Sequence, residues 1–265
     1  MSNDWIVPDW PAPVNVRAVS SIRTGGVSRG VYASLNLGGH VGDDSTAVAE
    51  NRRRLLAGLS LRHEPRWLNQ VHGAHVVHLN GGDIHEPAGG LWGSPQGDAA
   101  VAQSVDEACV IMTADCLPVL FCDRAAKTVA AAHAGWRGLA AGVLEAAVAA
   151  MRTSPDEVLA WLGPAIGPEA YEVGEEVRAV LIKEHPQAEQ AFESARPGKW
   201  LCDLYLLASL RLRRAGITHI YGGGFCTFSE HERFFSYRRH GECGRMATLI
   251  WLASSSSSLR LPEGD

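Results

Sequence analysis

The chain has 265 residues, of which 46% are apolar and 20% are charged, with a formal net charge of −5 and a pI of about 6.1. This balance is typical of a globular protein with a sizeable core and excludes an intrinsically disordered chain. The acidic net charge gives no basis for binding nucleic acid, and no apolar run approaches the about 18 residues that a membrane span requires.

Strand and helix signals alternate along the chain, which predicts an α/β or α+β fold. In chain order the expected elements are a strand at 16–20, a helix at 45–58, strands at 74–79, 108–112, 118–122 and 128–132, a helix at 138–151, a strand at 158–162, helices at 174–184 and 203–215, and strands at 217–221 and 247–252. Ser45 and Asp203 are the expected N-caps of their helices. The central strands are apolar throughout, which indicates burial on both faces.

We expect one domain over residues 1–265, with a core at about 6–252 and a flexible, serine-rich tail at 254–265. The N-terminus has neither the basic nor the apolar region of a signal peptide, so we expect a cytoplasmic protein. We expect it to be a monomer or a small homo-oligomer. Six cysteines without a Cys-x-x-Cys pair are then expected to be reduced, which argues against a zinc ribbon or a redox dithiol.

Three polar clusters lie beside predicted strands, and strand ends are where α/β scaffolds carry their sites. They are Gln-Val-His72-Gly, Thr-Ala-Asp115-Cys116-Leu-Pro and His133-Ala-Gly-Trp-Arg137-Gly. Zinc favours imidazole and thiolate ligands, so His72, Cys116 and His133 are the predicted metal ligands. Three protein ligands leave a fourth position for water, which is the pattern of a catalytic site. Asp115 would orient a ligand or act as an acid or base.

The same atoms support a second hypothesis that needs no metal. In it the Cys116 thiolate is a nucleophile and His133 is its base. Taken singly, each of these residues could also be an ordinary core histidine or a buried thiol. The eleven histidines are otherwise scattered and form no His-x-His pair, which does not favour a multicopper oxidase.

Other polar and aromatic residues are candidate substrate contacts. Arg23 follows a strand and precedes a Gly-Gly turn, and Arg137 stands where a helix is expected to begin, so both could hold an anion. In Phe-Phe235-Ser-Tyr237-Arg238-Arg, an aromatic ring could stack on a base while the guanidinium binds phosphate or carboxylate. Each arginine could equally form a surface ion pair.

Three neutral side chains complete the predicted substrate contacts. Ser34 and Asn36, in Ala-Ser-Leu-Asn-Leu-Gly, could hydrogen-bond a ribose or a base edge, although such residues also favour turns. Gln70 lies two residues before His72 and is predicted to contact the substrate.

Together these motifs resemble the YfiH-type family, which is also called the laccase-domain or purine nucleoside phosphorylase family. The resemblance runs from about Ile6 to Leu252, so it covers nearly the whole chain. Beyond the three clusters it rests on further motifs in the same order: Arg-Thr-Gly-Gly-Val-Ser, Ser-Leu-Asn-Leu-Gly, Gly-Asp-Ala, Trp-Leu-Gly-Pro-Ala-Ile-Gly-Pro, Cys-Thr and Phe-Phe-Ser-Tyr-Arg-Arg.

The resemblance implies a compact, multi-layered α/β/β/α fold with mixed central sheets and a zinc ion on His72, Cys116 and His133. It also implies phosphorolysis of adenosine, inosine, guanosine and methylthioadenosine, with deamination of adenosine, so the expected partners are a nucleoside and phosphate. One alternative implied by the family is an amidase that removes misincorporated serine from a UDP-muramyl precursor of peptidoglycan. A less favoured alternative is a polyphenol oxidase, for which the ion would be Cu²⁺.

Overall fold

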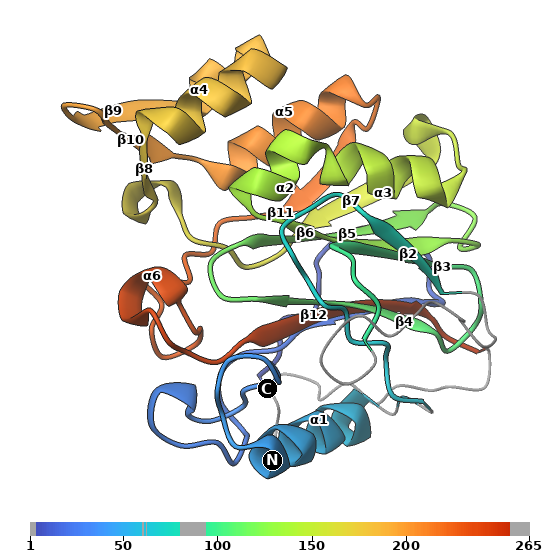
Figure 1. Ribbon diagram of the computed structural model, residues 1–265. Coiled ribbons are helices and arrows are strands. Elements are labelled where there is room, and N and C mark those ends of the chain that lie inside the picture. Colours follow the sequence, from blue (N-terminus) through green and yellow to red (C-terminus); the bar gives the residue numbers. More distant parts are fainter. Residues whose placement is uncertain (1–3, 60, 62, 80–93, 255–265) are drawn as a thin grey trace.

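The computed structural model describes residues 4–59, 61, 63–79 and 94–254. Figure 1 shows four layers: a group of helices, a large sheet, a second sheet, and α1 (Ser45–Leu59) beneath it. This arrangement confirms the predicted α/β/β/α fold. Among the helices that the structure describes, none has the length and apolar character that crossing a bilayer demands. The predicted tail lies, from residue 255 onward, outside the described residues.

The two stacked sheets differ in strand direction. Within the described part of the chain, the central sheet has six strands in the order β11-β7-β5-β6-β3-β2. They are β2 (Val76–Leu79), β3 (Ala99–Ala102), β5 (Leu117–Asp123), β6 (Val129–Ala134), β7 (Val158–Leu162) and β11 (His219–Gly222). Parallel and antiparallel pairings both occur in it, so the predicted mixed sheet is confirmed. The second sheet is antiparallel, in the order β1 (Val16–Ser20), β12 (Met246–Leu252) and β4 (Ala108–Thr113).

The strand β5 explains why the central strands are apolar at every position. Leu117, Val119 and Phe121 pack in the cluster beneath the helices, whereas Leu120 and Cys122 pack against the second sheet. All five side chains are fully buried. Because neighbouring residues of a strand point to opposite faces, a strand between two apolar layers needs no polar positions.

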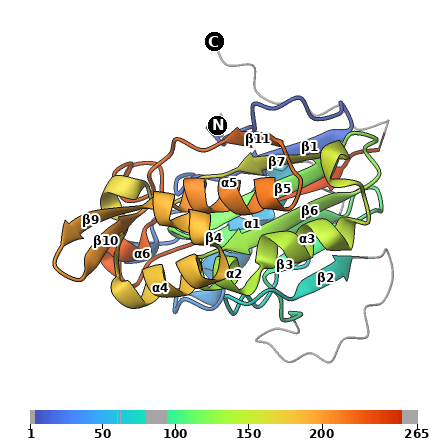
Figure 2. The same cartoon turned by 90° about the horizontal axis from the view of Figure 1, so that it is seen from above.

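The helix layer covers the outer face of the central sheet. It contains α2 (Trp136–Ala141), α3 (Val143–Met151), α4 (Glu175–Glu184) and α5 (Leu204–Arg214). Figure 2 looks down on this layer and shows α2, α3 and α5 over the strands. Asp203 is the N-cap of α5, as predicted, because its carboxylate accepts a hydrogen bond from the Leu206 N–H at 3.0 Å. The predicted Ser45 cap is wrong: Asp44 accepts from the N–H groups of Thr46 and Ala47 at the start of α1.

Several short elements escape the sequence pattern. A third sheet, in the order β8-β10-β9, is formed by β8 (Glu172–Gly174), β9 (Phe192–Arg196) and β10 (Lys199–Cys202). The strand β9 is mostly exposed and polar, so it gives no apolar run to detect. The alanine-rich strand β3 and the short helix α6 (Tyr237–His240) were not expected either. The strand β8 and the helix α6 lie side by side, because the Arg238 guanidinium donates to the Glu172 carbonyl at 2.7 Å.

One expected helix is in fact two. The segment predicted as a single helix at 138–151 divides at Gly142, which has a φ of 85° and caps the end of α2. Only glycine adopts this left-handed conformation readily, and a glycine inside a helical pattern does not reveal from sequence which conformation it takes.

The variant Gly142→Ala tests this break. We expect it to lower the free energy of unfolding by about 1 kcal/mol, because a Cβ is disfavoured at positive φ. Urea unfolding followed by circular dichroism measures the change. An increase in stability would instead indicate a continuous helix, in which alanine is favoured over glycine.

Candidate metal centre

The pairing of two strands brings Cys116 and His133 together. Cys116 immediately precedes β5, and His133 lies near the end of β6. These strands pair antiparallel with Pro118 opposite His133, so the residue before β5 reaches the end of β6. His72 comes from a loop whose backbone has a φ of 62° there, a conformation that is uncommon outside glycine.

The three predicted ligands converge. One donor atom from each of His72, Cys116 and His133 lies within 4.8 Å of the others. The Cys116 Sγ is 3.8 Å from the His72 Nε2, and the two imidazole rings meet edge to face with centroids 4.6 Å apart. Imidazole and thiolate donors at this spacing suit Zn²⁺ in charge and softness.

The space around Gly135 fits a metal centre. Gly135 lies between β6 and α2, and a Cβ added there would stand 2.8 Å from the Cys116 Sγ and 3.2 Å from the His72 Cδ2. The missing side chain leaves the sulfur and the ring free to take up a common centre. The residues present therefore fit a metal ion held by two imidazoles and a thiolate.

The triad is also an electrostatic unit. Burial disfavours the charged form of both Cys116 and His133, but each stabilises the charge of the other. The Cys116 thiolate and the Asp98 carboxylate raise the pKa of His133 to about 9, against the effect of burial. His133 and His72 lower the pKa of the Cys116 thiol to about 6, again against burial. The thiolate, which is the form that binds metals, is thus available at neutral pH.

Asp98 is the site residue that the sequence analysis missed. Its carboxylate is fully buried and accepts a 2.8 Å hydrogen bond from the Nδ1 of His133. It also accepts hydrogen bonds from the backbone N–H groups of Val71, His72 and Gly73, at 3.1, 2.8 and 2.7 Å. Asp98 is the central residue of the Gly-Asp-Ala family motif, but the neighbouring sequence does not show which groups the Asp98 carboxylate contacts.

Asp115 ties three segments together beside the triad. One carboxylate oxygen accepts from the Thr227 hydroxyl and the other from the backbone N–H of Arg238, both at 2.6 Å. Its own carbonyl accepts from the Ile166 N–H at 2.9 Å. Asp115 thus fixes the segment that carries Cys116, and both of its carboxylate oxygens have partners within the protein.

The predicted contacts Arg23, Ser34 and Asn36 all have hydrogen-bond partners within the protein. The Arg23 guanidinium donates to the carbonyls of Ala33 and His231 at 2.9 to 3.0 Å. The Ser34 hydroxyl accepts from the Gly26 N–H and donates to the Arg23 carbonyl. The Asn36 side chain is fully buried and hydrogen-bonds Asp43 and the Gly38 and Arg245 backbones. These side chains are engaged in hydrogen bonds within the fold.

Gln70 and Phe235 are occupied in the same way. The Gln70 amide makes two 2.8 Å hydrogen bonds with the backbone of Met112. Phe235 is 1% exposed and packs with Phe234 and Met246 in a small apolar cluster. The structure gives its ring no free face for a base.

Two of the predicted arginines are exposed. Arg137 stands in the first turn of α2, four residues after His133, with its guanidinium 4.4 Å from the Trp136 ring centroid. Arg238 lies in α6, donates to the Glu172 carbonyl at 2.7 Å and stands 5.2 Å from the centroid of the Tyr171 ring. Burial raises the pKa of Tyr171, and the nearby Cys116 thiolate adds to that effect. Tyr171 is therefore an aromatic side chain close to the triad that the sequence analysis did not single out.

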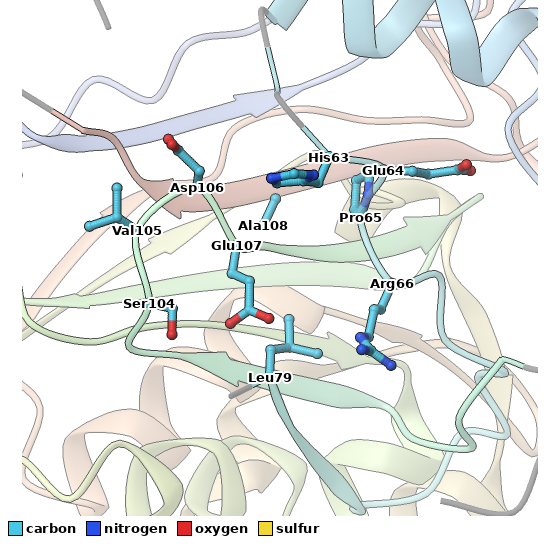
Figure 3. Close-up of a pocket in the computed structure, with 10 residues that line it drawn as sticks. All are labelled: His63, Glu64, Pro65, Arg66, Leu79, Ser104, Val105, Asp106, Glu107 and Ala108. Atoms are coloured by element: carbon cyan, nitrogen blue, oxygen red, sulfur yellow. The ribbon is translucent and has the colours of Figure 1, made fainter. Parts of the chain in front are cut away.

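A cavity of about 460 Å³ lies elsewhere (Figure 3). It is lined by Leu79 at the end of β2, by Ala108 at the start of β4, and by residues 63–66 and 104–107, which lie outside the strands. The triad lies beyond the other end of β4, roughly 17 Å away along that strand at about 3.3 Å per residue. His72, Cys116 and His133 take no part in this cavity, so we place the candidate site at the triad.

Comparison with known proteins identifies the family. Residues 17–253 match the family model described as multi-copper polyphenol oxidoreductase laccase. The chain belongs to this laccase-domain family. A purine nucleoside phosphorylase of Pseudomonas aeruginosa is 54% identical to it over 94% of this chain and 99% of that protein. The Escherichia coli protein YfiH, also named purine nucleoside phosphorylase, is 52% identical over 93% of this chain and 98% of that protein.

Solved structures of two relatives share the laccase-domain fold. A Neisseria meningitidis protein has a TM-score of 0.87 at 50% identity, covering 95% of this chain and all of that chain. YlmD from Geobacillus stearothermophilus has a TM-score of 0.88 at 33% identity, covering 94% of this chain and 96% of that chain. These matches confirm the resemblance to the YfiH-type family that the sequence motifs indicated.

Proposed function

We propose that this protein is a zinc-dependent purine nucleoside phosphorylase. Its substrates would be adenosine, inosine, guanosine and methylthioadenosine, and it would also deaminate adenosine. The names of the relatives from Pseudomonas aeruginosa and Escherichia coli support the phosphorylase activity. The observation that carries the proposal is the convergence of His72, Cys116 and His133 within 4.8 Å. A bound Zn²⁺ would supply Lewis acidity beside the nucleoside.

The residues around the triad suit these reactions. In phosphorolysis a phosphate oxygen bonds to ribose C1′ while the C1′–N9 bond breaks, and the leaving base takes up a proton. In deamination, water adds at C6 of adenosine and ammonia leaves, which gives inosine. The exposed guanidinium groups of Arg137 and Arg238 are the proposed phosphate holders, because guanidinium binds phosphate in a bidentate way. Tyr171 is the proposed surface for the purine ring.

The test is a product analysis with protein of known metal content. Adenosine is incubated with the zinc-loaded protein, with and without phosphate, and products are identified by mass spectrometry. We expect inosine with ammonia in both samples. Adenine, hypoxanthine and ribose 1-phosphate should form only where phosphate is present, because inosine is itself a proposed substrate. A UDP-muramyl nucleotide that carries serine is run in parallel. Release of serine, with adenosine unchanged in both samples, would contradict the proposal and favour the amidase.

Replacement of Tyr171 tests the purine surface. We expect Tyr171→Ala to raise KM for adenosine about tenfold, since base–aromatic stacking contributes about 1–3 kcal/mol. Tyr171→Phe keeps the ring and should retain KM within about twofold. Steady-state kinetics at saturating phosphate measures both. Equal KM values for the alanine variant and the wild type would remove Tyr171 from the substrate contacts.

A further inference from the structure

We propose that Asp98 is a positioning residue that holds both histidine ligands of the triad in their metal-binding orientation. The inference rests on the metal centre of the proposed function and not on which reaction occurs there. Asp98 follows Gly97 and immediately precedes β3, the strand that pairs with β6. It is therefore anchored next to His133, whose backbone N–H donates to the Asp98 carbonyl at 2.7 Å.

Asp98 holds the first ligand through its ring. The 2.8 Å contact between the Asp98 Oδ1 and the His133 Nδ1 is buried, with side-chain exposures of 0% and 5%. A carboxylate there accepts the Nδ1–H, which leaves Nε2 as the nitrogen that can bind a metal. The hydrogen bond also fixes the rotation of the ring.

Asp98 holds the second ligand, His72, through the backbone of the loop that carries it. The loop around His72 places three successive N–H groups on one carboxylate. The backbone of His72 adopts the left-handed conformation, with a φ of 62°. A non-glycine residue keeps this conformation only when its surroundings stabilise it. The Asp98 carboxylate stabilises this conformation by accepting three hydrogen bonds from the loop. The position of the His72 ring therefore depends on a residue 26 positions away.

The two roles belong to one carboxylate, which makes a specific demand on its chemistry. An asparagine has the same shape but one donor and one acceptor in place of two acceptor oxygens. Each Asp98 oxygen accepts from two of the four N–H groups, so two of them would then face the amide NH₂. The Asp98→Asn variant should therefore disturb one ligand or the other with little change in volume.

The matched control is Asp123→Asn. Asp123 is also buried, at 4% exposure, and its carboxylate accepts from the backbone N–H groups of Lys127 and Thr128 at 2.7 and 2.9 Å. It lies at the far end of β5 from Cys116. Both N–H groups donate to Oδ1, which asparagine can keep as its amide oxygen, so this control makes the same exchange at a buried carboxylate without touching the triad.

The experiment measures Zn²⁺ affinity by competition with a chelator, on variants whose folding is checked by circular dichroism. We expect Asp98→Asn to bind Zn²⁺ about 10- to 100-fold more weakly than the wild type, and Asp123→Asn to bind it equally well. An unchanged affinity in Asp98→Asn, or an equal loss in both variants, would overturn the proposal.

A second measurement needs no variant and decides the case if Asp98→Asn does not fold. Nitrogen-15 NMR of the zinc-loaded wild-type protein reports which ring nitrogen of His133 carries the proton. We expect a protonated Nδ1 and a zinc-bound Nε2. Coordination through Nδ1 would contradict the assigned role of Asp98.

Discussion

Replacing Cys116 by alanine is expected to remove the bound metal and to lower phosphorolysis and deamination by about 100-fold or more. The thiolate is the sulfur donor of the triad, and its loss leaves only two imidazoles, which hold Zn²⁺ far more weakly. Metal content by mass spectrometry of the purified variant and initial rates with adenosine measure the two effects.

The control for this prediction is Cys226→Ala. Cys226 is the other partly exposed cysteine in the part of the chain that the structure describes, and its Sγ accepts from the Gly167 N–H and from Ser229. We expect it to keep wild-type metal content and rates. Full metal content and full activity in Cys116→Ala would remove the triad from the function.

Chelation of the wild-type protein separates the metal hypothesis from the thiolate nucleophile, because Cys116→Ala would remove activity under both. The lowered pKa of the Cys116 thiol, at about 6, is compatible with both hypotheses, because cysteine acts as a thiolate whether it is a nucleophile or a metal ligand. A metal-free wild-type protein that keeps its activity after chelation would favour Cys116 and His133 acting without a metal. Loss of activity on chelation, with recovery on adding Zn²⁺, is the result we expect.

Adding one methyl group at Gly135 is expected to have the second largest effect. The Cβ of Gly135→Ala would lie 2.8 Å from the Cys116 Sγ, closer than real Cβ contacts come, so the sulfur or the backbone must move. We expect Zn²⁺ affinity to fall by about 10- to 100-fold, a loss similar to that from removing a supporting contact of a metal ligand. The backbone itself permits alanine, because Gly135 has a φ of −74°. Chelator competition measures the affinity, and thermal unfolding of the metal-free protein measures separately what the added methyl group costs the fold.

Gly73→Ala is the matched control. Gly73 follows His72 in the same site, yet a Cβ there would stand 3.5 Å from the Asp98 Oδ2 and 3.8 Å from Val71, which are ordinary contacts. We expect this variant to bind Zn²⁺ as the wild type does. Equal affinities for the two alanine variants would show that the space at Gly135 is not needed for the metal.

The fold class and the three side chains that converge at the candidate metal centre could be predicted from the sequence because their signals are local. Buried strands such as 118–122 are apolar at consecutive positions, and this pattern alone requires a layer on each face. The polar motifs that contain His72, Cys116 and His133 interrupt the apolar pattern, and this interruption indicates them as candidate metal ligands. The family motifs then indicated the α/β/β/α arrangement that the structure shows.

Only the tertiary structure decided which polar and aromatic groups are free to bind a ligand. Arg23 and Phe235 have the chemistry of substrate contacts. However, the Arg23 guanidinium donates to the carbonyls of Ala33 and the distant His231, and packing around the Phe235 ring buries it. Asp98 is the opposite example, a residue whose importance only the folded structure reveals. Its hydrogen-bond partners lie in the His72 loop and in β6, which are far apart in the sequence. Side-chain chemistry is a property of the residue, whereas its availability depends on neighbours that the chain brings together only by folding.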